Sequence, residues 1–126
     1  MEKLIAVLEK ELHIERGAEE MVSVTKELFV SKVWNSLYND YLEGSITGTI
    51  RNEMVSIQYD ADCLCFCRMD YSTYNINIMR PKNNNIMIDL SKVTEVRLSI
   101  SSCNWIDIHL LVNDTYDTYV SIVVRG

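Results

Sequence analysis

Asp107 and His109 are the residues whose types and spacing come closest to acid–base chemistry. They alternate with apolar residues at Ile106, Ile108 and Leu110. Such alternation predicts a β-strand with one buried face, so both polar side chains would lie on the opposite, outer face. There Asp107 could orient His109 as a general base. In the strand register argued below, Arg97 lies opposite His109 and Ser99 lies opposite Asp107.

A charged cross-strand ladder on a solvated face explains the same residues without catalysis. A catalytic triad also needs a nucleophile in a cleft with an oxyanion hole, and a flat sheet offers neither. The chain has no glycine-rich phosphate loop and no nucleophile elbow. We therefore expect a protein that is not an enzyme and has no catalytic residue. A small enzyme using Asp107 and His109 is the alternative.

Arginines on or beside the expected strands are candidate ligands for an anion, because a planar guanidinium fits phosphate or carboxylate. Tyrosines close to them could stack on a base. Strand arginines also extend to solvent or pair with acids, here Glu53, Asp70 and Glu95. The candidate residues for binding a ligand or partner are Arg68, Arg80, Arg97, Asp107, His109 and Tyr119, and Arg51, Tyr71 and Tyr74 belong to the same arginine and tyrosine set.

Three of the four cysteines stand two residues apart, at Cys63, Cys65 and Cys67. On a strand, side chains at this spacing lie about 6.5–7 Å apart on one face, too far for a disulfide. Parallel thiols also do not converge on one metal ion. We expect small buried side chains facing the preceding strand at Val55, Ile57 and Tyr59, with no metal and no cofactor. Free thiols fit a reducing compartment.

Length and charge narrow the class of protein. A chain of 126 residues is most simply one domain, 1–126, with a helical segment at 1–43 and a sheet at 44–126. The net charge of −6 disfavours non-specific binding to nucleic acid. No apolar run is long enough to span a membrane, and the N-terminus does not resemble a signal peptide. We therefore expect a cytoplasmic protein.

Apolar residues at helical spacing predict a short helix over 2–12 and a longer one over 18–42. The longer helix would carry its apolar stripe on Met21, Val24, Leu28, Leu37 and Tyr41, widened by Val30 and Trp34. Period-two alternation predicts strands at about 46–50, 54–59, 63–69, 73–79, 85–90, 93–101, 105–113 and 118–125. The expected fold is α+β, with two N-terminal helices packed on one face of an antiparallel β-meander of about seven strands.

The register of three hairpins follows from keeping apolar residues on one face. The first pairs Ile100 with Ile106, Leu98 with Ile108 and Val96 with Leu110. The second pairs Val112 with Val120 and Leu110 with Ile122. The third pairs Ile78 with Ile86 and Ile76 with Ile88, and leaves the only proline, Pro81, in a turn.

The face opposite the core also carries apolar residues, which predicts that a second subunit covers it. The expected homo-oligomer interface comprises Leu64, Phe66, Met79 and Met87, and Leu111 and Val123 share the same face.

These features favour a non-catalytic binding or inhibitor protein, a small cytosolic homo-oligomer that sequesters or blocks a partner such as a host protein. The frequent Asn, Ile and Tyr are typical of AT-rich genomes, which favours a phage or mobile-element anti-defence protein. One mechanism is blockade of a protein through acidic helices that carry Glu9, Glu11, Glu15, Glu19 and Glu20. The alternative is a sponge for a small anionic, nucleotide-type ligand bound by arginine and tyrosine at subunit boundaries.

Overall fold

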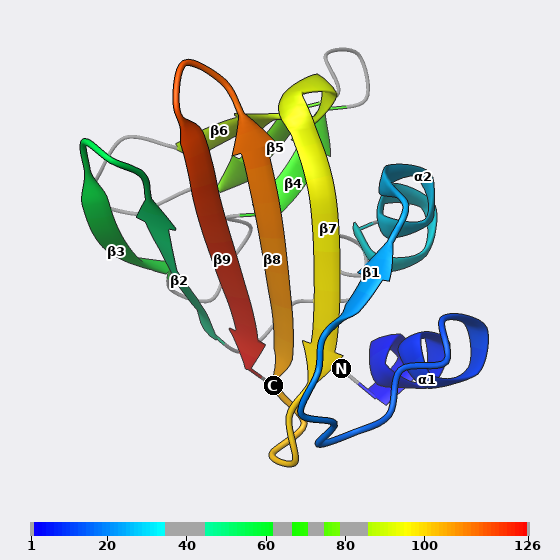
Figure 1. The fold of residues 1–126 in the computed structure, drawn as a ribbon. Coiled ribbons are helices and arrows are strands. Elements are labelled where there is room, and N and C mark those ends of the chain that lie inside the picture. The colour runs from blue at the N-terminus through cyan, green and yellow to red at the C-terminus, as the bar shows by residue number, and fades with distance from the viewer. Residues whose placement is uncertain (1, 35–44, 62–66, 71–74, 79–85, 126) are drawn as a thin grey trace.

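The computed structural model describes residues 2–34, 45–61, 67–70, 75–78 and 86–125 (Figure 1). Its helices are α1 (Glu2–Glu11), α2 (Lys26–Leu28), the π-helix η1 (Phe29–Trp34) and the 3₁₀-helix η2 (Leu90–Lys92). Its strands are β1 (Val22–Val24), β2 (Ser45–Arg51), β3 (Ser56–Ala61), β4 (Cys67–Asp70), β5 (Asn75–Ile78), β6 (Ile86–Asp89), β7 (Val93–Ile100), β8 (Ile106–Asn113) and β9 (Asp117–Arg125). None of the helices within these ranges is long and apolar enough to cross a membrane.

The described strands form two antiparallel sheets. The larger is open and six-stranded, in the order β1-β7-β8-β9-β2-β3, and the smaller consists of β4, β5 and β6. Figure 1 shows the smaller sheet behind the upper part of β7–β9, with α1 and α2 beside β1. The α+β class, with its helices N-terminal and its sheet antiparallel, is confirmed. The expected single meander is not observed, because β4, β5 and β6 form a separate sheet and β2 pairs with the last strand, β9.

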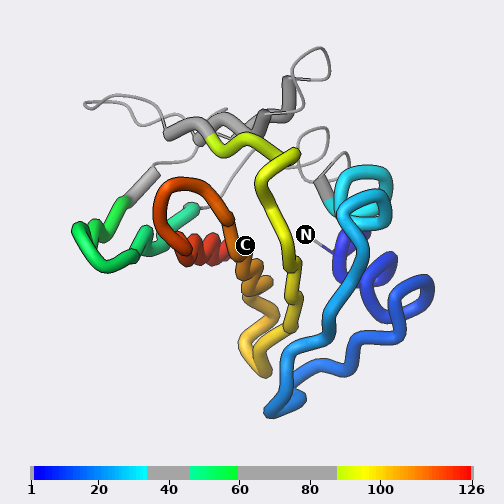
Figure 2. Tube along the Cα trace, turned by 45° about the horizontal axis from the view of Figure 1, so that its top comes forward, coloured from blue at the N-terminus to red at the C-terminus, as the bar shows by residue number. Residues whose placement is uncertain are grey.

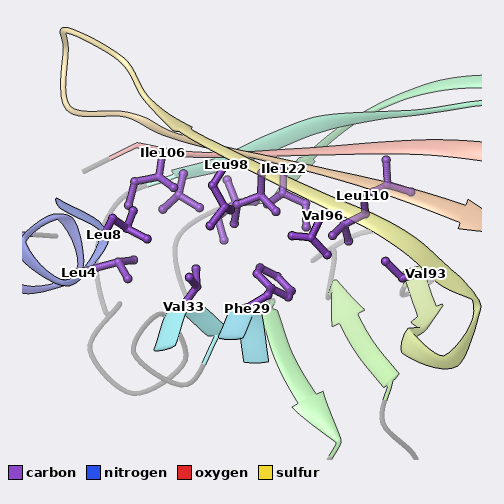
Figure 3. Close-up of a cluster of buried hydrophobic side chains, with 14 of the residues drawn as sticks. Leu4, Leu8, Phe29, Val33, Val93, Val96, Leu98, Ile106, Leu110 and Ile122 are labelled. Atoms are coloured by element: carbon purple, nitrogen blue, oxygen red, sulfur yellow. The ribbon is translucent and has the colours of Figure 1, made fainter. Parts of the chain in front are cut away.

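The inner face of the large sheet carries the core, which alternation in β7, β8 and β9 explains directly. Buried residues alternate with more exposed ones from Val96 to Ile100, from Ile106 to Val112 and from Val120 to Val124. In Figure 3 the side chains of Leu4, Leu8, Phe29 and Val33 point toward this face from α1 and η1. The helices and the end of β6 thus share one hydrophobic cluster with the sheet, which includes Ile88 and Leu90.

The expected helix over 18–42 is wrong in its first part. Val22 and Val24 lie in β1 and pair antiparallel with Leu98 and Val96 at the edge of β7. The helical turn begins only at Lys26, because the side chain of Thr25 accepts a hydrogen bond from the Leu28 amide at 3.1 Å and caps that turn. The rest of the expected helix, including Leu37 and Tyr41, extends beyond the described residues.

Backbone contacts hold the segment between α1 and β1 against the β7–β8 turn (Figure 2). The Gly17 amide donates to the carbonyl of Ile100 at 2.7 Å, and Gly17 has a φ of +71°, which favours glycine. Arg16 bonds both Glu9, at 2.9 Å, and the side-chain oxygen of Asn104, at 3.0 Å. These contacts bring β1 alongside β7.

Two of the three expected hairpin registers are confirmed, those of β7–β8 and β5–β6. The register of β8–β9 is wrong by two residues. Leu110 lies opposite Val120, and Ile108 lies opposite Ile122. A shift of two residues keeps every side chain on its face, so hydrophobic alternation cannot distinguish the two registers.

The expected pairing of the cysteine strand with the preceding strand is also wrong where the structure describes it. The preceding strand, β3, belongs to the large sheet, whereas Cys67 lies in β4 of the small sheet and pairs with Ile78. Cys63 and Cys65 lie outside the described residues. The fourth cysteine, Cys103, is a free, exposed thiol at the β7–β8 turn.

Candidate functional site

The outer face of the large sheet places polar side chains in rows that run across the strands. One row runs from Arg97 through His109 and Ser121 to Thr49. The adjacent row runs from Glu95 through Leu111 and Tyr119 to Arg51. All these side chains are half-buried or exposed. The face opposite the core is therefore a continuous solvent-facing surface of mixed chemistry.

Tyr119 lies at the centre of this surface. Its hydroxyl forms a short hydrogen bond with Nδ1 of His109. The two rings meet edge to face, with centroids 5.1 Å apart and an interplanar angle of 79°. On the other side, the Arg51 guanidinium carbon lies 5.9 Å from the centre of the tyrosine ring, within the range of a cation–π contact. A cation and an imidazole thus hold the ring in place.

Charges surround Tyr119 without converging on one point. Arg97 donates through Nε to Glu95 at 2.7 Å, as expected for a strand arginine beside an acid. The pKa of His109 is lowered below 6.5, mainly by burial of the imidazole. The nearby Asp107 carboxylate raises this pKa, and the positive charge of Arg97 lowers it further. His109 is therefore neutral near pH 7, and the tyrosine hydroxyl occupies its Nδ1.

These residues line a depression of about 220 Å³, whose walls are Glu95, Arg97, His109, Leu111 and Tyr119, together with Leu110. We call this depression the tyrosine hollow. It combines an apolar side chain, an aromatic ring, an ion pair and a neutral imidazole. Tyrosine and arginine are among the side chains enriched in the residues that dominate binding energy at protein interfaces.

A second depression, of about 440 Å³, lies beside the tyrosine hollow over β2 and is lined by Thr47, Gly48, Thr49, Gln58, Tyr59, Ser121 and Val123. The Ser121 hydroxyl bonds both the amide and the hydroxyl of Thr49 at 3.0 Å. The Tyr59 hydroxyl donates to the Ser121 carbonyl at 2.7 Å. Gly48 permits this approach, because a methyl group there would overlap both the Ser121 carbonyl oxygen and the Tyr59 ring.

The structure brings together four of the six candidate binding residues: Arg97, Asp107, His109 and Tyr119 all lie on the outer face. Leu111 and Val123 share that face and are half-buried, as expected. Arg68 lies in β4 and Met87 in β6, where only the backbone is described. Arg80, Leu64, Phe66, Met79, Tyr71 and Tyr74 lie outside the described residues.

Sequence reasoning missed the contact between His109 and Tyr119. In the register expected for β8–β9, Tyr119 lies opposite Asn113, too far along the strand to reach His109. In the observed register Tyr119 lies opposite Leu111, which makes it a diagonal neighbour of His109. The two registers keep the same side chains on each face, so the face rule did not find the contact.

The expected acidic helices are not a single helical surface. Only Glu9 and Glu11 lie on α1, and they pair with Arg16 at 2.9 Å and with Lys32 at 3.5 Å. The three other acids are exposed in the segment between α1 and β1, at Glu15, Glu19 and Glu20. Their charge is therefore spread over a loop rather than gathered on a helix.

At the far end of the inner face, a crevice of about 210 Å³ is bordered by charged residues that include Asp89, Lys92 and Asp114. Lys92 bonds Asp114 at 3.1 Å, and this bond is the first cause that lowers the pKa of Asp114. Hydrogen bonds from the Ser91 side chain and amide lower the pKa of Asp89. No group of three His, Cys, Asp or Glu side chains able to hold a metal ion occurs among the described residues.

Comparison of the chain with protein-family models, with curated proteins and with solved structures finds no match. The case for a function therefore depends on the outer face itself.

Proposed function

We propose that the protein is a non-catalytic binding protein that recognises a protein partner through the outer face of its large sheet. The tyrosine hollow is the observation that carries the proposal. Tyr119 and Arg97 are of the types enriched among the residues that dominate binding energy, and Leu111 supplies apolar area between them. A partner that covers this surface could be sequestered or blocked without any chemical step.

The arrangement around His109 favours binding over catalysis. The tyrosine hydroxyl engages Nδ1, the atom that an orienting carboxylate would bond in an Asp–His pair. The serine directly opposite His109 is Ser121, and its hydroxyl is engaged by Thr49. Neither the base nor the hydroxyl is therefore arranged for proton transfer between the two.

Site-specific photo-crosslinking tests the proposal. A benzoylphenylalanine is placed at position 111, in the tyrosine hollow, and at the exposed position 10 on α1 as the control. We expect a discrete adduct with another protein in cells that produce this chain, from position 111 and not from position 10. Equal adducts from both positions, or adducts only between copies of this chain, would contradict the proposal.

A pair of tyrosine substitutions then separates recognition from folding. Tyr119→Ala should reduce the yield of the adduct about tenfold or more, since truncating a central interface tyrosine typically costs about 2 kcal/mol. Tyr116→Ala is the matched control, because Tyr116 is an exposed tyrosine on the β8–β9 turn. An equal loss in both variants would indicate a general effect on the fold.

A small anionic ligand is a second candidate, favoured by one observation. Arg51 and Arg97 lie on either side of the paired rings of Tyr119 and His109, an arrangement able to bind phosphate beside a stacked base. Thermal unfolding with AMP, ATP and a cyclic dinucleotide tests it. Binding to the native state alone raises the melting temperature. The shift should be lost in Arg97→Gln, and no shift at millimolar nucleotide rejects this candidate.

A further inference from the structure

Among the described strands, β3 forms one edge of the large sheet. In the strand order, β3 comes last, after β2, and Figure 1 shows it at the left margin. An edge strand presents a row of backbone amides and carbonyls that can pair with another strand. The opposite edge is β1, which has only three residues and is a much shorter template.

The hydrogen bonding at the β2–β3 turn shows which backbone groups of β3 face outward. The carbonyl of Val55 accepts from the Asn52 amide at 2.9 Å, so it points toward β2. In an antiparallel ladder, residues alternate between the two neighbours. The groups of Ile57 therefore point toward its partner in β2, Ile50, and those of Ser56 and Gln58 point toward the open side.

Part of this edge is apolar and uncharged. Met54, Val55 and Ile57 are 67%, 45% and 41% exposed. Residues 54–59 contain no charged side chain and no proline, and Glu53 and Asp60 flank them, although natural edge strands are commonly protected by a lysine, a proline or a bulge. In a chain of net charge −6, this stretch brings no like charges of its own together when two copies pair.

The sequence of the edge is complementary to itself. A two-fold axis at Ile57 would pair Ile57 with Ile57 of the second copy and Val55 with Tyr59 of the second copy. It would also pair Ser56 with Gln58 of the second copy, which joins the two outward-facing sets of backbone groups. Over residues 55–59, apolar residues thus meet apolar residues on one face and neutral polar residues meet on the other, as a symmetric interface requires, and Met54 would pair with Asp60 of the second copy at each end.

We propose that two copies of this chain associate through antiparallel pairing of their β3 strands about Ile57, which joins the two large sheets into one. This surface differs from the expected interface at Leu64, Phe66, Met79 and Met87. It is also separate from the tyrosine hollow, which lies on the outer face over β7, β8 and β9. The dimer leaves both hollows open, so the two proposals can fail independently.

Disulfide trapping tests the pairing at the level of single residues. Ile57 would face its own copy in a non-hydrogen-bonded pair, with Cα atoms about 4.5 Å apart, close enough for a disulfide. Gln58 would lie diagonally from its own copy, about 7–8 Å away and too far for one. Ile57→Cys and Gln58→Cys, each in the Cys103→Ser chain, are therefore matched variants on one strand.

Under mild oxidation we expect Ile57→Cys to form a covalent dimer at least tenfold faster than Gln58→Cys, with the 57–57 linkage identified by mass spectrometry. Equal rates would overturn the proposed register. Sedimentation of the unmodified chain should show a concentration-dependent dimer across the micromolar to submillimolar range. A monomer throughout that range would overturn the dimer, and would leave a strand of another protein as the occupant of this edge.

Two variants should abolish the dimer without removing a core side chain. Gln58→Pro deletes an outward-facing amide, and proline is tolerated where an edge amide faces solvent. Ile57→Lys places a charge on the half-exposed edge, so it provides the test if the proline variant fails to fold. A dimer that persists in folded Ile57→Lys would contradict the proposal.

Discussion

Phe29 and Leu28 are neighbours in the chain, and the structure assigns them opposite roles. Phe29 is fully buried, whereas Leu28 is 40% exposed. The aromatic ring lies under the large sheet, close to Val96 and Ile122 (Figure 3). Replacing a buried phenylalanine with alanine costs about 3–5 kcal/mol, because apolar contact is lost and a cavity remains. Leu28→Ala should cost less than about 1 kcal/mol, since its side chain is partly solvated already.

Urea unfolding monitored by circular dichroism measures both changes. With an m value of about 2 kcal/mol/M, a loss of about 4 kcal/mol lowers the midpoint by about 2 M. This is a large part of the ~5–15 kcal/mol that stabilises a typical domain. Phe29→Ala should therefore be close to unfolded in water if the protein lies at the lower end of that range. If Leu28→Ala destabilised the protein as much as Phe29→Ala, Leu28 would have to be buried, as the helical stripe expected from the sequence places it. That result would refute the observed packing.

Three further predictions concern single elements. Gly48→Ala should cost about 1–3 kcal/mol, because its methyl group would overlap the Ser121 carbonyl oxygen and the Tyr59 ring, whereas Thr47→Ala should leave the melting temperature almost unchanged; equal effects would reject these close approaches. Thr25→Ala should cost about 1 kcal/mol in urea unfolding through loss of the helix cap, and Thr25→Ser should retain most of it. Because burial lowers the pKa of His109, the unfolded chain binds a proton more readily, so this residue costs stability as the pH falls below about 6.5. The stability lost between about pH 7.5 and about pH 5.5 should be smaller in His109→Gln than in the unaltered chain, and an identical loss would contradict the assignment.

Period-two alternation predicted most of the fold because it reports directly on burial. From Val96 onward, β7, β8 and β9 bury alternate side chains, so a one-residue error in register would expose the core. The observed β7–β8 register, with Arg97 opposite His109, agrees with this rule. The rule alone selects neither this register nor that of β8–β9, because a slip of two residues preserves both faces.

Local pattern also failed where tertiary pairing decided the structure. Met21, Val24 and Leu28 have helical spacing, yet Val22 and Val24 lie in a short strand that pairs with the edge of β7. The pairing of β2 with β9 joins residues 68 to 80 positions apart, and no local signal encodes it. The contacts of Tyr119 depend on two pairings that the sequence pattern does not predict, because the register of β9 brings Tyr119 to His109 and the β2–β9 pairing brings Arg51 to Tyr119.

Hydroxyl-radical footprinting of two tyrosines tests the central claim, that the outer face is a recognition surface, most directly. Tyr119 lies in the tyrosine hollow, and Tyr116 is an exposed reference on the β8–β9 turn of the same chain. The oxidation of Tyr119 relative to Tyr116 is compared between the purified protein and cells that produce it. We expect Tyr119 to be protected several-fold in cells while Tyr116 is labelled equally in both. An unchanged ratio would show that nothing covers the outer face and would contradict the proposed function.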